Sequence, residues 1–99
     1  MPKQYIWDDD KRKANIAKHG FDFAKAGEVL DSRYRLDVVM TRGGEERTQS
    51  FSYALGYLAV LTVVHMERDN ATRIISFRRA SKDEKEIYDD WLENKFDDA

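Results

Sequence analysis

The chain has 99 residues, of which 41% are hydrophobic and 36% charged, and this composition predicts one folded domain with one core. It contains no cysteine, which excludes disulfide frameworks, thiolate metal sites and cysteine nucleophiles. The net charge of -2 divides unevenly, because residues 1–85 hold 16 basic and 13 acidic side chains, whereas residues 86–99 hold one basic and six acidic side chains. The chain lacks a membrane-spanning apolar stretch and a secretory signal pattern, so we expect a soluble, cytoplasmic protein.

The N-terminal residues predict a short strand and a first helix. Tyr5 to Trp7 form a short extended piece. The three aspartates at positions 8–10 can cap a helix and complement the positive end of its dipole. We expect this helix to run to about His19, with Gly20 as the residue after its end.

A second, shorter helix is predicted to follow almost at once. Asp22 is a second capping residue, and three apolar residues recur after it at helical spacing: Phe23, Ala26 and Leu30. Two small helices therefore precede the sheet.

The middle of the chain predicts a hairpin and a buried strand. Apolar residues alternate over positions 36–40, the glycines at 43–44 make a turn, and a second strand covers about 47–54. Residues 58–66 form a nearly continuous apolar, β-branched run, which favours a strand buried on both faces at the centre of the sheet.

The last strand is predicted over residues 73–78, after a turn in the segment ERDNAT. Regular alternation would place Ile75 and Phe77 on one face of the sheet and Ile74 and Ser76 on the other.

A final helix begins after Ser81, which caps it, and Glu84 completes a capping box. One apolar stripe is expected on this helix, made of Ile87, Tyr88, Trp91 and Leu92. The predicted fold is α+β: a short strand, two helices, an antiparallel sheet of about four strands and a C-terminal helix, with the helices on one face. We expect one domain over residues 1–99, with an acidic helical extension at about 89–99.

Two histidines are candidates for chemistry. His19 follows Lys18 in the last turn of the first helix, where the pair either complements the helix dipole or projects toward a substrate. His65 lies in the buried strand and suits a core histidine better than a catalyst. No carboxylates accompany the histidines at ligand spacing, so we expect no metal site and no cofactor.

Charged side chains on the strands are the second group of candidates. Glu46 and Arg47 follow the turn glycines and could form only a surface ion pair. Arg73, Arg78 and Arg79 surround the last strand, where guanidiniums either bind phosphate bidentately or discourage strand addition at an edge.

These motifs together resemble one family. A first strand that ends in WD, the KHG helix end, the GEER turn, the RIISFRRA strand and a helix with Glu84 and Tyr88 are similar to the BrnT toxins, over about Tyr5 to Tyr88. The resemblance implies a fold similar to RelE-type ribonucleases. It also implies an endoribonuclease that inhibits growth by cutting RNA and that a BrnA-like antitoxin neutralises. Toxin and antitoxin would form a heterotetramer that contacts operator DNA only through the antitoxin.

The positions that match the family's motifs are Lys18, His19, Glu46, Arg47, Arg73, Arg78, Glu84 and Tyr88. RNA cleavage without a metal needs a base, an acid and cations that stabilise charge on phosphorus. We expect His19 to act as base or acid and Arg73, Arg78 and Lys18 to hold the phosphate. Tyr88 would stack a base or relay a proton, and Arg47 and Arg79 would bind RNA. Glu84 suits a helix cap better than catalysis.

Two alternatives remain open from the sequence. The chain could be a non-enzymatic interaction module, or an inactive toxin homologue that acts with its antitoxin in transcriptional autoregulation. The acidic tail, which carries Trp91, Leu92 and Phe96, either packs on the domain's own sheet or docks a basic partner.

Overall fold

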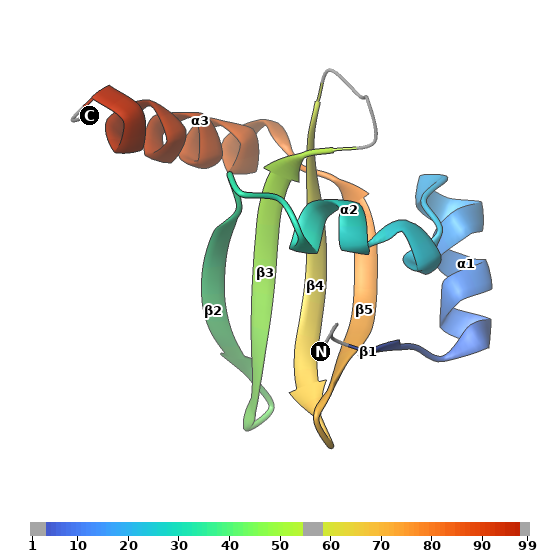
Figure 1. Cartoon of the computed structure of the whole chain (residues 1–99). Coiled ribbons are helices and arrows are strands. Elements are labelled where there is room, and N and C mark those ends of the chain that lie inside the picture. The colour runs from blue at the N-terminus through green and yellow to red at the C-terminus, as the bar shows by residue number, and fades with distance from the viewer. Residues whose placement is uncertain (1–3, 55–58, 98–99) are drawn as a thin grey trace.

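The structure, a computed structural model, describes residues 4–54 and 59–97. The elements in chain order are β1 (Gln4–Ile6), α1 (Asp9–His19), the 3-10 helix η1 (Phe23–Lys25), α2 (Gly27–Leu30), β2 (Leu36–Arg42), β3 (Glu45–Tyr53), β4 (Val60–Arg68), β5 (Ala71–Arg79) and α3 (Lys82–Asp97). The predicted α+β class is confirmed (Figure 1). Leu58, where the central strand was expected to begin, lies outside the described residues.

The sheet has five strands in the order β1-β5-β4-β3-β2. β4 lies at the centre, as the apolar run predicted. The expectation of about four antiparallel strands was wrong in one respect, because β1 joins the sheet as a fifth strand parallel to β5. The sequence of three extended residues does not reveal which strand they pair with. β5 lies beside β1 only because the helices and the strands β2 to β4, which come between them in the chain, fold back to this edge.

Local turn chemistry fixes the two hairpins. Gly43 and Gly44 have φ values of 59° and 82°, a left-handed conformation that glycine adopts without strain. They close the predicted β2–β3 hairpin, in which Arg42 faces Glu45. Asp69 and Asn70 adopt φ values of 52° and 65° between β4 and β5, in the predicted ERDNAT turn.

α1 begins and ends as predicted, whereas the second helix does not form as one piece. The Asp8 side chain accepts a hydrogen bond from the Lys11 N–H at 3.0 Å, and Gly20 ends the helix with φ 79°. Asp22 is confirmed as the second cap, since it accepts from the Ala24 N–H at 2.9 Å. After it the chain forms a single 3-10 turn and then the short α2 rather than one continuous helix.

The buried Asn15 side chain fastens α1 to the outer edge of β5. Its amide nitrogen donates to the Phe77 carbonyl at 2.7 Å, and its amide oxygen accepts from the Phe77 N–H at 3.2 Å. The same nitrogen donates to the Phe21 carbonyl at 2.8 Å. β1 pairs only with residues 71–73 of β5, so Phe77 has no strand partner on this edge among the described residues. The Asn15 amide takes the place of that partner and satisfies backbone groups that burial would otherwise leave unpaired.

A β-bulge in β5 overturns the predicted alternation of that strand. Val64 pairs with Ser76 and His65 pairs with Ile74, so Ile75 is the extra residue. As a result Ile74 and Phe77, expected on opposite faces, both belong to the core under the helices.

The two faces of the sheet carry separate clusters of buried residues. The face under α1, η1 and α2, here the helix face, buries the larger cluster: Phe21, Phe23, Ala26, Val29, Leu30, Leu61, Val63, Ile74 and Phe77. Strand alternation puts Arg47, Gln49 and Phe51 on the opposite face, here the open face. Figure 1 shows α2 crossing in front of β3 and β4.

α3 covers one end of the open face. Tyr88 is fully buried with Phe51 and Val60, and Trp91 and Leu92 pack against this cluster. Helices thus lie on both faces rather than on one. Ile87, expected in the same apolar stripe, is 57% exposed. The side chain of Phe96 lies outside the described part of the chain.

Candidate active site

Arg78 and Glu84 form an ion pair that joins β5 to the first turn of α3. The Arg78 Nη1 donates to Glu84 Oε1 at 2.7 Å, and Nη2 donates to Oε2 at 3.0 Å. Glu84 also accepts from the Gln49 side chain at 2.7 Å and from the Ser81 N–H at 2.8 Å. The bonds from Arg78 are the largest cause of a Glu84 pKa lowered to about 2. The carboxylate therefore holds the Arg78 guanidinium in one orientation.

The predicted capping box is part of this arrangement. The Ser81 Oγ accepts from the Glu84 N–H at 3.2 Å while the Glu84 carboxylate accepts from the Ser81 N–H. Glu84 is thus a helix cap, as expected, and it also orients Arg78.

His19 lies within the electrostatic field of Arg78. Asn15 is fixed to Phe77, and His19 is one helical turn further on the same side of α1, so it is held near the end of β5. The pKa of His19 is lowered, first by partial burial and then by the positive charges of Lys18 and Arg78. A lowered pKa favours the neutral imidazole, the form that accepts a proton.

Arg47 shares a hollow with Arg78 on the open face. The hollow has a volume of about 310 Å³ and lies over β2, β3, β4 and β5. The Nε of Arg47 is buried and has no hydrogen-bond partner within residues 4–54 and 59–97. A buried, unpaired guanidinium nitrogen is costly, and a bound anion or acceptor would satisfy it. We call His19, Arg47, Gln49, Arg78 and Glu84 the Arg78 cluster.

Arg73 does not join the Arg78 cluster. It lies near the other end of β5, in a small hollow with Ile6, Trp7 and Asp8. It is five positions before Arg78 in the strand, which corresponds to about 16 Å along β5. The two arginines can therefore contact one RNA strand but not one phosphate.

Tyr88 and His65 lie away from the Arg78 cluster. Tyr88 is 0% exposed and donates a hydrogen bond to the Tyr34 carbonyl at 2.7 Å, so its ring cannot stack an RNA base in this structure. His65 faces the helix side, with Nε2 at 2.8 Å from the Ser50 Oγ. The Ser50 hydroxyl donates its proton to Asp37 at 2.6 Å, so Nε2 must be the donor to Ser50. His65 therefore fits the predicted core histidine.

The remaining candidates are at the surface. Lys18 is exposed beside His19, and Arg79 is exposed beside Arg78, whose Nη1 donates to the Arg79 carbonyl at 3.2 Å. Glu46 is exposed near the β2–β3 turn. Alternation along β3 places the Glu46 side chain on the face of the sheet opposite Arg47, so these two sequence neighbours do not share a site.

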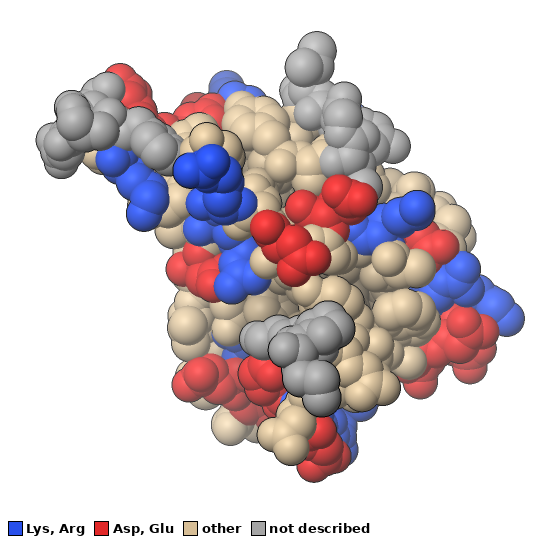
Figure 2. All heavy atoms as spheres, viewed as in Figure 1, with Lys and Arg blue, Asp and Glu red and all other residues tan. Residues whose placement is uncertain are grey.

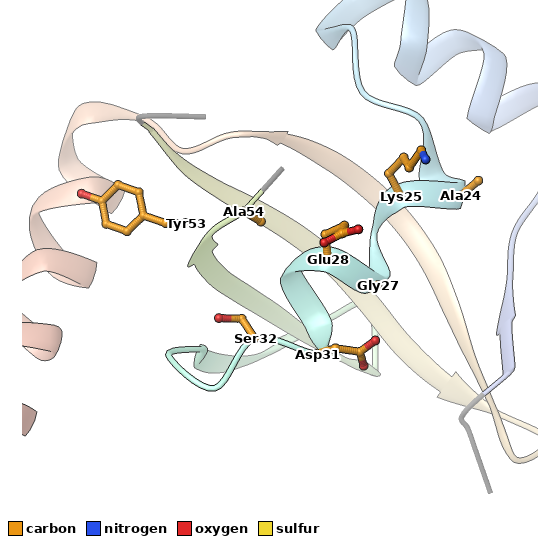
Figure 3. A pocket seen from close by; sticks show the side chains of 8 residues that line it. All are labelled: Ala24, Lys25, Gly27, Glu28, Asp31, Ser32, Tyr53 and Ala54. Carbon is orange, nitrogen blue, oxygen red and sulfur yellow. The ribbon is translucent and has the colours of Figure 1, made fainter. Parts of the chain in front are cut away.

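A larger hollow, of about 530 Å³, lies on the helix side and away from the arginines. Figure 3 shows its lining, with Glu28 on α2, Asp31 directly after that helix, Tyr53 at the end of β3 and Ala54 directly after that strand. Two carboxylates against the single cation of Lys25 make it a poor site for phosphate. Figure 2, which views this side, shows both charge signs interspersed over the described surface.

Among the described residues there is no group of three or more histidine, aspartate and glutamate side chains that could hold a metal ion. None of the helices in this part of the chain is long and apolar enough to cross a membrane.

Gln49 is the residue of the Arg78 cluster that sequence reasoning missed. Its only signal was a period of two with Arg47 and Phe51, which places the three on one face of a strand. That α3 would bring Glu84 to this face could not be read from spacing.

The fold and the Arg78 cluster define a small α+β protein with a histidine and arginines suited to a phosphodiester. The profile of the family described as ribonuclease toxin, BrnT, of type II toxin-antitoxin system matches residues 7–84. The chain therefore belongs to the BrnT family of ribonuclease toxins, whose type II systems imply an RNA target and an antitoxin partner. No curated protein sequence matches the chain.

Proposed function

We propose that this protein is the toxin of a type II toxin-antitoxin module and cuts RNA at the Arg78 cluster through the ribose 2′-hydroxyl, without a metal ion. The observation that carries the proposal is that His19, whose pKa is lowered, lies within the electrostatic field of an Arg78 guanidinium that Glu84 orients. A base and an oriented cation are two of the three kinds of group that this reaction requires.

In the proposed reaction His19 removes the proton from the 2′-hydroxyl. The 2′-oxygen attacks phosphorus and forms a 2′,3′-cyclic phosphate, while the bond to the 5′-oxygen of the next nucleotide breaks and that oxygen takes a proton from solvent. Negative charge grows on the phosphoryl oxygens, which Arg78 and Lys18 stabilise. Arg78 uses three of its five N–H groups within the described chain, so two remain for the phosphate.

Arg47, Arg73 and Arg79 bind the RNA strand away from the cut in this proposal. Arg73, about 16 Å from Arg78, would hold a phosphate farther along the strand. Because this contact only positions the strand, its loss should raise KM more than it lowers kcat.

We assign a BrnA-like antitoxin as the partner, in a heterotetramer that contacts operator DNA only through the antitoxin and acts in the cytoplasm. The family membership supports the antitoxin. The exposed acidic residues of α3, which include Glu86, Asp90 and Glu93, would suit a basic surface of that partner.

Expression in bacteria tests the ribonuclease. We would compare wild type with His19→Ala and Arg78→Ala, and use Lys25→Ala as the control, since it removes an exposed cation on the helix side. We expect growth arrest and new RNA ends, mapped by primer extension, with wild type and Lys25→Ala only. Circular dichroism would establish that each variant is folded.

Purified protein tests the mechanism. Cutting should continue in EDTA and should stop when the ribose at the cut site lacks its 2′-hydroxyl. Intact RNA and normal growth with folded wild-type protein would instead favour the interaction module or the inactive homologue. Cutting that EDTA abolishes would contradict the metal-independent reaction.

A further inference from the structure

The hollow beside Arg78 has an apolar floor, which phosphate binding does not explain. Met40 on β2, Val64 on β4 and Ile75 on β5 line it. The bulge has a direct consequence here, because both Ile75 and the next residue, Ser76, line the same hollow. An apolar floor of this kind suits the flat face of a ring.

Gln49 supplies a hydrogen-bond acceptor whose orientation is chemically fixed. Its amide nitrogen donates to Glu84, and a carboxylate that also accepts from Arg78 cannot instead receive the amide oxygen. The carbonyl oxygen of Gln49 is therefore the end turned away from Glu84. Ser76 adds a hydroxyl that can donate or accept.

Three guanidiniums surround the floor, from Arg42, Arg47 and Arg78. The buried Nε of Arg47, unpaired in the described part of the chain, calls for an acceptor from a ligand. An acidic peptide side chain would satisfy the arginines but would leave the apolar floor and the Gln49 oxygen without contacts.

We infer that this hollow binds one unstacked base of the RNA strand next to the cut, and that it prefers guanine. Arginine pairs well with the N7 and O6 acceptors of guanine. The N–H groups on the Watson–Crick edge of guanine match the Gln49 oxygen, while the ring lies on Met40, Val64 and Ile75. This inference deepens the proposed ribonuclease and rests on it.

Methyl NMR tests the site with probes that cannot be cut. We would add the four nucleoside 5′-monophosphates, and inorganic phosphate separately, to the full chain. A stacked ring should move the Met40, Val64 and Ile75 methyl resonances upfield, most with 5′-GMP, and phosphate should not. The Val39 methyls, 60% exposed on the opposite face of β2, should stay in place.

A pair of variants adds an affinity measurement. Met40→Ala removes part of the floor and should weaken 5′-GMP binding about tenfold. Val39→Ala, on the same strand, should leave it unchanged. Equal shifts from all four nucleotides would overturn the guanine preference. Floor methyls that stay in place, or that respond to an acidic peptide but to no nucleotide, would overturn the base site.

RNA cleavage separates failure of the base site from failure of the proposed function. Wild type should cut next to guanine, and Met40→Ala and Ser76→Ala should still cut but with less preference for it. Cutting with the same preference in both variants would overturn the base site and leave the ribonuclease standing. Floor methyls that respond to 5′-GMP in a protein that cuts no RNA would overturn the ribonuclease and leave the base site standing.

Discussion

Glu84→Gln should destabilise the protein at neutral pH, because it replaces the carboxylate that accepts from Arg78, Gln49 and Ser81. A pKa that falls from 4.5 to about 2 corresponds to about 3 kcal/mol at 1.36 kcal/mol per pH unit. The Glu84 and Arg78 side chains are 21% and 30% exposed, so solvent screens part of this interaction. We therefore expect a loss of about 2 kcal/mol in the free energy of unfolding.

The direction of the Glu84 pKa shift determines how the stability difference changes with pH. Since the pKa of Glu84 is lower in the folded chain, its stabilisation is complete above the ordinary value of 4.5 and is lost as the pH falls toward 2. The difference between wild type and Glu84→Gln should thus be about two fifths smaller at pH 3.5 than at pH 7.

Urea unfolding, followed by tryptophan fluorescence at both pH values, measures this difference. Glu86→Gln removes an exposed carboxylate two residues along α3 and should change stability by less than about 0.5 kcal/mol. Equal effects of the two substitutions, or a Glu84→Gln effect that does not change with pH, would refute the reasoning.

Three further predictions concern single side chains. Asn15→Leu should lower the free energy of unfolding by about 2–4 kcal/mol, measured by thermal denaturation, because two backbone groups of Phe77 lose their partner; an unchanged Tm would contradict the role of Asn15 at the strand edge. Tyr88→Phe should cost about 1 kcal/mol and leave the RNA cleavage rate unchanged, and a large drop in rate would restore Tyr88 as a candidate for catalysis. The cleavage rate should fall in acid with a midpoint below 6.5, because the pKa of His19 is lowered, and Lys18→Ala should move that midpoint to higher pH; a midpoint that does not respond to Lys18→Ala would argue against His19 as the base.

The helix caps and turns could be read from the sequence because each depends on a few neighbouring residues. Asp8, Gly20 and Asp22 form the predicted caps, and Gly43 and Gly44 form the predicted turn. The central strand could also be predicted from the sequence, since a long β-branched run has to be buried on both faces. These features are local, and the structure agrees with them.

The bulge at Ile75 could not be predicted, because a regular alternation fits RIISF as well as the bulged strand does. Its effect on the site is large, since it exposes Ile75 and Ser76 together on the open face. The pairing of β1 with β5 could not be predicted for the same reason, because strand pairing depends on two segments and cannot be read from one of them.

The candidate site also combines features that the sequence predicts with features that depend on the fold. The sequence by itself determined the residue types, with a histidine at the end of α1, a basic last strand and a capping box at Glu84. Only the tertiary structure decided that the charge of Arg78 rather than that of Arg73 acts on His19, that Gln49 donates to Glu84, and that Tyr88 is buried. The physical reason is that residue types are given by the sequence directly and a helix cap depends only on residues within one helical turn. The Arg78 cluster instead draws its residues from β3, β5, α1 and α3, which meet only when the sheet has formed.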